Sequence, residues 1–112
     1  MTKNTVGLSE KIEITGQNSK KKVNAKVDTG ATIGSIDVKL ASELKLGPVI
    51  NIKKVKQAHG NSNRAIIEAE ITFAGQTFTS QFTLADRSHM KFPVLLGQNQ
   101  LKSVLIDPEK SL

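Results

Sequence analysis

Residues 23–31, Val-Asn-Ala-Lys-Val-Asp-Thr-Gly-Ala, decide how the fold is assigned. The valine, alanine and valine of this stretch alternate with polar residues, which predicts a β-strand with one buried face. The strand leads directly into Asp28, and Gly30 lets the backbone approach a partner or a substrate closely. A carboxylate at the end of an apolar strand can be held rigidly for catalysis. Taken alone, however, Asp-Thr-Gly is a short motif that also fits an ordinary turn aspartate.

The remainder of the chain reads mostly as short strands separated by turns. Alternating apolar residues and turn signals predict them at residues 10–15, 49–56, 67–73, 78–84, 92–96 and 104–106. Residues 38–46 have the spacing of a short amphipathic helix that ends at Gly47-Pro48. We therefore predict an all-β fold, a single small closed β-barrel domain of residues 1–112 with one or two short helices.

Two polar segments are assigned to turns. The run of lysines at residues 20–22 follows Gln, Asn and Ser and is expected at a loop tip between two strands. Residues 59–63, His-Gly-Asn-Ser-Asn, form a turn cluster that precedes the hairpin of residues 67–84. The stretch around Gly30 and Gly34 is expected to be tight and irregular.

Two segments resemble the retropepsin class of aspartic proteases. Asp28-Thr29-Gly30-Ala31 resembles the active-site motif, and residues 92–101, Phe-Pro-Val-Leu-Leu-Gly-Gln-Asn-Gln-Leu, resemble the second signature, an apolar strand running into a turn and a short helix. About 70 residues separate the two motifs, with a flap candidate between them. Residues 84–97 and 105–112 are similar to a retropepsin-like family named as ATP-dependent zinc proteases, which sometimes accompanies a glutamate ligase acting on a ribosomal protein.

The resemblance implies a homodimeric peptidase. The chain carries one Asp-Thr-Gly, so the second catalytic carboxylate would come from a second copy, and the two would share one proton. Asp28, Thr29 and Gly30 would form the catalytic set, with Thr29 bracing the dyad across the two-fold axis. Residues 57–64 would close over a peptide or protein substrate as a flap. The expected substrate contacts are Ala31, His59, Gly60, Asn61 and Arg87.

Two polar positions have open roles. Arg87 could read substrate carboxylates, or it could form a structural ion pair with Asp86 or Asp107. Retroviral enzymes pair an acidic residue after the motif with an arginine after the second glycine. The matching positions here are Thr32 and Gln98, so a neutral hydrogen bond could replace that pair.

The amino-acid composition limits which catalytic groups and cofactor sites the chain can have. The 112 residues include no cysteine and two histidines, which removes disulfides, thiol nucleophiles and cysteine-based zinc sites. His-Glu-x-x-His and a glycine-rich phosphate loop are both missing from the sequence. We expect no metal and no cofactor. No apolar run approaches the roughly 20 residues that span a membrane, so we expect no membrane association and a cytoplasmic location.

Peptide-bond hydrolysis is the leading function, with an acidic or glutamate-modified protein tail as one substrate. The alternatives are a noncatalytic dimeric binding module of the same fold and a small basic nucleic-acid-binding barrel. The net charge of +6 suits an acidic partner. The sequence has no Trp or Tyr and four Phe, so a base-stacking platform is not evident and we do not expect nucleic acid as the partner.

Overall fold

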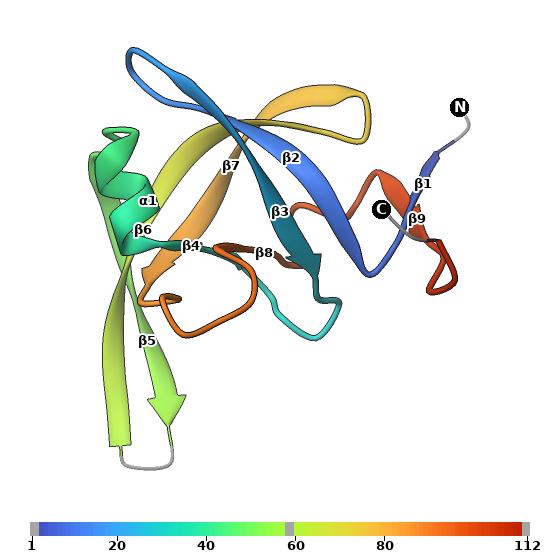
Figure 1. Ribbon diagram of the computed structural model, residues 1–112. Helices are drawn as coiled ribbons and strands as arrows, with labels where there is room; N and C mark the ends of the chain where they lie inside the picture. The colour runs from blue at the N-terminus through green and yellow to red at the C-terminus, as the bar shows by residue number, and fades with distance from the viewer. Residues whose placement is uncertain (1–2, 58–59, 111–112) are drawn as a thin grey trace.

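The computed structural model describes residues 3–57 and 60–110, and nearly all of their regular structure is β (Figure 1). The elements in chain order are β1 (Asn4–Val6), β2 (Ser9–Thr15), β3 (Lys20–Val27), β4 (Gly34–Asp37), α1 (Val38–Glu43), β5 (Val49–Gln57), β6 (Gly60–Phe73), β7 (Gln76–Ala85), β8 (Val94–Leu96) and β9 (Val104–Ile106). In the part of the chain that is described, the helical structure is too short to cross a membrane.

Six strands close into a barrel, as the sequence predicts. They pair in the order β2-β3-β8-β4-β7-β6, and antiparallel pairing of β6 with β2 completes the ring. Closure removes the exposed edges that an open sheet would present. β5 lies outside the ring as a partner of β6, and their hairpin projects from the barrel toward the bottom of the view in Figure 1. β1 and β9 form a separate parallel pair.

The core consists of the alternate residues that the sequence places on one face of each strand. In β6 these are Ile67, Ala69, Ile71 and Phe73, all buried. β7 adds Phe82 from across the ladder, which is fully buried and directly opposite Ile67. Burial of such a side chain contributes roughly 1.5–3 kcal/mol, so the period-two pattern accounts for much of the barrel's stability.

Several boundaries differ from the sequence prediction. The lysines at residues 20–22 belong to β3, where they pair with residues 13–15 of β2, rather than to a loop tip. Residues 60–63 are the first part of β6 rather than a turn cluster. The stretch around Gly34 contains β4, a strand that the sequence did not reveal. The described residues contain one helix, although the sequence prediction allowed two. Residues 97–101, which could have formed the second helix, form hydrogen-bonded turns instead.

The helix α1 begins where expected and ends slightly earlier. Leu40, Ala41 and Leu44 are buried against the barrel. Lys45 adopts a positive φ of 55°, and the Leu46 N–H donates to the Ala41 carbonyl, which terminates the helix with a C-terminal cap. This cap stops the helix before Gly47-Pro48.

Candidate active site

Asp28 is fixed at the end of a strand inside the ring. β3 pairs in parallel with β8, aligning Val27 with Leu96. The Asp28 N–H then donates to the Leu96 carbonyl at 3.0 Å, and the Val27 N–H donates to the Leu8 carbonyl at 2.9 Å. Because the backbone is held on both sides, the carboxylate that follows has little freedom to move.

The turn after Asp28 folds back on the carboxylate. Its Oδ1 accepts the Gly30 N–H at 2.9 Å, and its carbonyl accepts the Ala31 N–H at 3.3 Å. Asp28 and Ala31 are half-buried, while Thr29 and Gly30 are exposed. The predicted catalytic residues therefore lie together on one open surface of the single chain.

The second signature supports this turn directly. The Gln98 N–H donates to the Ala31 carbonyl at 2.7 Å, and the Asn99 N–H donates to the Thr32 carbonyl at 3.3 Å. The Gln98 side chain also donates, from Nε2 to the Thr29 carbonyl at 2.8 Å. A neutral hydrogen bond thus joins the two motifs, although its acceptor is a backbone oxygen of Thr29.

Gly97 is required where the motifs cross. A Cβ at this position would lie 2.7 Å from the Ile33 carbonyl carbon and 2.8 Å from the Gly34 nitrogen, closer than Cβ atoms come to backbone. Neither backbone group can move without shifting the turn beyond Asp28. The glycine of the second signature is therefore a packing requirement.

Two polar side chains beneath the turn were not identified from the sequence. Gln100 is 1% exposed, accepts the Gly97 N–H and donates to Ser80 Oγ and the Gln81 carbonyl. Asn99 accepts the Gly34 N–H and also donates to the Gln81 carbonyl. Both follow Gly97 directly, so the second signature was the available signal for them.

The flap candidate is the β5–β6 hairpin. Gly60 and Asn61 are exposed in β6 and pair with Gln57 and Lys56, while His59 lies outside the described residues. No hydrogen bond joins Gly60 or Asn61 to Asp28 in the described single chain. The predicted flap residues are therefore near the tip of a projecting hairpin, apart from the catalytic turn.

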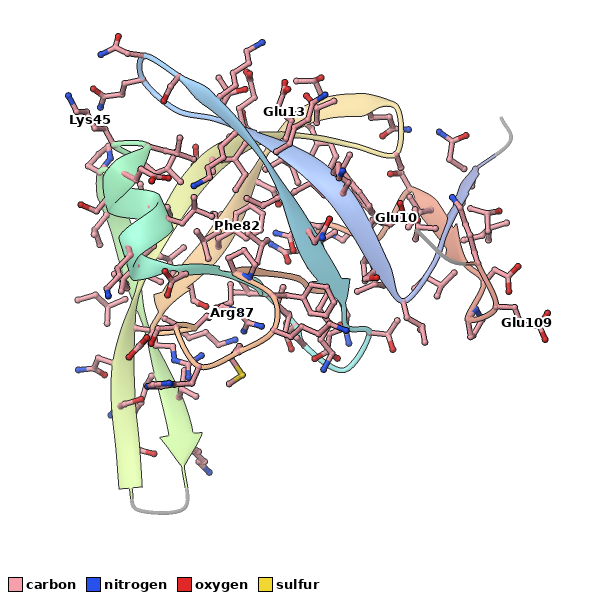
Figure 2. The ribbon with its side chains drawn as sticks, in the orientation of Figure 1. Glu10, Glu13, Lys45, Phe82, Arg87 and Glu109 are labelled. Atoms are coloured by element: carbon pink, nitrogen blue, oxygen red, sulfur yellow. The ribbon has the colours of Figure 1, made fainter. Side chains whose placement is uncertain are left out.

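Arg87 lies on the loop of residues 86–93, which connects β7 to β8. Its N–H donates to Asp37 Oδ1 at 2.8 Å, and its Nε donates to the Phe92 carbonyl at 2.9 Å. Burial lowers the pKa of the Arg87 guanidinium, and the nearby Arg64 lowers it further, while Asp37 and Asp28 act in the opposite direction. Figure 2 shows Arg87 beside the base of the β5–β6 hairpin.

The expected ion pair of Arg87 with Asp86 or Asp107 is not formed. Asp86 Oδ1 instead accepts the N–H and hydroxyl of Ser88, and these hydrogen bonds lower the pKa of Asp86. Asp107 Oδ1 accepts the Glu109 N–H. Both carboxylates are used to close local turns, so the sequence interpretation of an ion pair was wrong.

The described ranges, with His59 outside them, contain no group of three or more His, Asp or Glu side chains arranged to hold a metal ion. At Asp28 the structure brings together a carboxylate and the backbone N–H of Gly30.

A family model decides the classification. The model described as "RimB-like: Retropepsin-like aspartic endopeptidase RimB" matches residues 39–112, about two thirds of the chain. The chain belongs to the RimB-like family. The description of this family mentions neither zinc nor ATP, so the zinc-protease name of the related family is not confirmed. No curated protein matches the chain.

Solved structures share the RimB-like chain's fold. A Legionella pneumophila protein of unknown function, Lpg0085 (DUF785), is 18% identical with a TM-score of 0.67, and the match covers 99% of this chain and 98% of that chain. The EIAV protease complexed with the inhibitor HBY-793 is 19% identical with a TM-score of 0.66 and 84% coverage of both chains. The Simian Foamy Virus (mac) protease is 18% identical with a TM-score of 0.63, covering 83% of this chain and 90% of that chain. The fold is therefore retropepsin-like.

Proposed function

We propose that this protein is an aspartic endopeptidase whose catalytic dyad consists of Asp28 from each of two copies. The observation that carries the proposal is the position of Asp28, which follows β3 directly and is tied to β8 through the Leu96 carbonyl. Its carboxylate is braced by the Gly30 N–H while the surface around it stays open.

The second carboxylate requires a second copy because the chain's other aspartates are engaged elsewhere. Asp37 accepts the Arg87 N–H, and Asp86 and Asp107 close local turns. Thr29 and Gly30 are exposed in the single chain, as residues facing a two-fold partner would be. Two close carboxylates share one proton, which provides a base and an acid.

The reaction then follows from these two protonation states. The ionised Asp28 removes a proton from water as the water oxygen attacks the peptide carbonyl carbon. The protonated partner carboxyl donates its proton to the carbonyl oxygen, which gives a neutral tetrahedral intermediate. Collapse of this intermediate breaks the C–N bond as Asp28 gives the proton that it took from water to the leaving amine nitrogen. The ionised partner carboxylate takes a proton from one hydroxyl, which leaves a carboxylic acid and restores the shared proton of the dyad. The paired hairpins cover the substrate and exclude water.

An acidic peptide is the substrate class that the hairpin favours. Lys53 and Arg64 are directly opposite each other on β5 and β6, and both are half-buried. Like charges in this arrangement are destabilising, and the sequence has no Asp or Glu between residues 44 and 67. The half-buried Arg87 adds a third positive charge, close enough to Arg64 for the two charges to affect each other. Substrate carboxylates would relieve this repulsion, in agreement with the acidic or glutamate-modified tail considered from the sequence.

The Asp28→Asn variant tests the proposal. We expect loss of hydrolysis by at least roughly a thousandfold, since the amide cannot act as a base. A suitable assay follows cleavage of quenched-fluorescent peptides, one series rich in glutamate and one neutral. Glu43→Gln makes the same chemical change on the exposed end of α1 and serves as the control, with activity retained. Full activity in Asp28→Asn would exclude the dyad, and binding without cleavage by the wild type would favour the noncatalytic module.

A further inference from the structure

One residue fastens both ends of the loop of residues 86–93. The Asp37 N–H donates to the Pro93 carbonyl at 2.9 Å, and the Asp37 carboxylate accepts the Arg87 N–H at 2.8 Å. Asp37 ends β4, which lies between β7 and β8 in the ring, so it is adjacent to both strands that the loop connects. The loop's position therefore depends on a side chain some fifty residues earlier in the sequence.

Asp37 is a buried carboxylate without a cation partner in the described part of the chain. It is 8% exposed, and none of the ion pairs in that part of the chain joins a Lys or Arg side chain to its oxygens. A buried charge is costly unless hydrogen bonds compensate it, and a charge-assisted bond from a backbone N–H is among the strong ones. The carboxylate thus serves to hold the loop backbone.

This arrangement leaves the Arg87 guanidinium available to a ligand. Its Nε donates across the loop to the Phe92 carbonyl, which fixes the direction of the side chain. None of the ion pairs found among residues 3–57 and 60–110 includes Arg87. The half-buried guanidinium is influenced by the charges of Arg64 on the hairpin and of Asp37 and Asp28, with opposite effects on its pKa. A guanidinium in this position has the donors to bind a carboxylate.

We propose that Asp37 is a positioning residue, which holds the loop of residues 86–93 so that Arg87 binds a substrate carboxylate. The inference rests on the proposed function and adds a specific residue that acts through Arg87. Asp37 contacts the loop backbone and does not touch the substrate. Its removal therefore affects substrate binding and leaves the chemical step at Asp28 in place.

Three variants separate this role from a general structural one. Asp37→Ala removes the acceptor, whereas Asp37→Asn keeps an amide oxygen in the same place. Glu43→Ala removes an exposed carboxylate from the far end of α1, the helix that follows Asp37, as a control. For a glutamate-rich peptide we expect Asp37→Ala to raise KM about tenfold with kcat nearly unchanged. Asp37→Asn should stay within about threefold of the wild type, since the hydrogen bond to the Arg87 N–H is retained. Glu43→Ala should leave KM unchanged.

A double-mutant cycle tests whether Asp37 acts through Arg87. If it does, Asp37→Ala combined with Arg87→Ala should have the same KM as Arg87→Ala alone. Hydrogen exchange provides a readout without turnover, because the Arg87 amide should lose protection in Asp37→Ala and keep it in Asp37→Asn. Additive effects on KM, or an Arg87 amide that stays protected in Asp37→Ala, would overturn the proposal.

A binding measurement makes the outcome independent of catalysis. The affinity of the glutamate-rich peptide, carrying a fluorescent label, is measured for the Asp28→Asn variant and for the double variant that also carries Asp37→Ala. Weaker binding in the presence of Asp37→Ala supports the positioning role even if the wild type cleaves nothing, in which case the proposed peptidase function alone fails. Equal binding with and without Asp37→Ala contradicts the positioning role, whatever the activity of the wild type.

Discussion

At the scale of single residues, two glycines in the same site have different tasks. Gly97 is packed against the backbone of Ile33 and Gly34, so the folded chain itself has no room for a side chain there. Gly30 is exposed, and the nearest atom to a Cβ added there is Asp28 Oδ1 at 3.2 Å. Gly97 therefore supports the fold, whereas Gly30 leaves space for whatever approaches Asp28.

Alanine substitutions should separate these tasks. Gly97→Ala should lower the free energy of unfolding by roughly 1–3 kcal/mol or more, because the methyl group overlaps backbone atoms that cannot yield separately. Gly30→Ala should change the free energy of unfolding of the single chain little but reduce activity and dimer affinity. Urea denaturation and peptide cleavage measure the two quantities. An equal loss of stability in both variants would contradict this division of roles.

Metal dependence is also decided by individual side chains. The sequence has no cysteine and two histidines, and a dyad of carboxylates activates water without a Lewis acid. We expect prolonged incubation with a chelator to leave cleavage of the peptide series unchanged. Loss of activity after chelation, with recovery when zinc is added, would contradict this expectation.

The residues of the site were predictable to different degrees. Asp28, Thr29 and Gly30 form a local motif, and the second signature indicated Gly97, so pattern and spacing were sufficient for them. The contact of Arg87 with Asp37 was missed because it joins residues fifty positions apart through a backbone N–H. Side-chain pairing rules do not identify such a bond, and they favoured an ion pair with the neighbouring Asp86.

At the scale of elements, polar composition misled the assignment of strands. The lysines at residues 20–22 extend β3 because residues 13–15 of β2 offer a complete ladder, although charged runs usually indicate loops. β4 was missed for the opposite reason. All four of its residues are buried between β7 and β8, so the alternation that reveals a half-buried strand is not present.

The two faces of the β5–β6 hairpin allow a matched test of the substrate class. Arg64 is half-buried opposite Lys53, whereas Lys54 is exposed on the other face. Arg64→Gln should raise KM for glutamate-rich peptides several-fold, while removal of a like-charge contact raises the free energy of unfolding by about 0.2–1 kcal/mol. Lys54→Gln should change KM little. Similar KM changes in both variants would argue against recognition of carboxylates by the face that carries Arg64. An equal increase of KM for neutral peptides in Arg64→Gln would argue against it as well.

At the scale of the whole molecule, the closed barrel leaves one open surface around Asp28. Leu8, whose carbonyl holds β3 next to the catalytic turn, is 54% exposed, and Leu105 of β9 is 56% exposed. The exposed Leu8 next to the end of β3, with the exposed Thr29 and Gly30 just beyond that end, suits an isologous interface in which each copy covers the same surface of the other. The closed barrel followed from alternation along the strands. The order of pairing did not, because it depends on contacts between distant segments.

Mixing the wild type with Asp28→Asn tests the shared dyad most directly. When the two proteins exchange subunits freely, each mixed dimer has one ionisable Asp28 and should be inactive. At equal amounts, activity per wild-type chain should fall to about one half, and at a threefold excess of the variant to about one quarter. In the control, an equal amount of albumin in the same buffer replaces the Asp28→Asn variant, and activity per wild-type chain should stay constant. Activity that stays constant as the variant is added, under conditions where mixed dimers are shown by mass spectrometry, would contradict a dyad built from two chains.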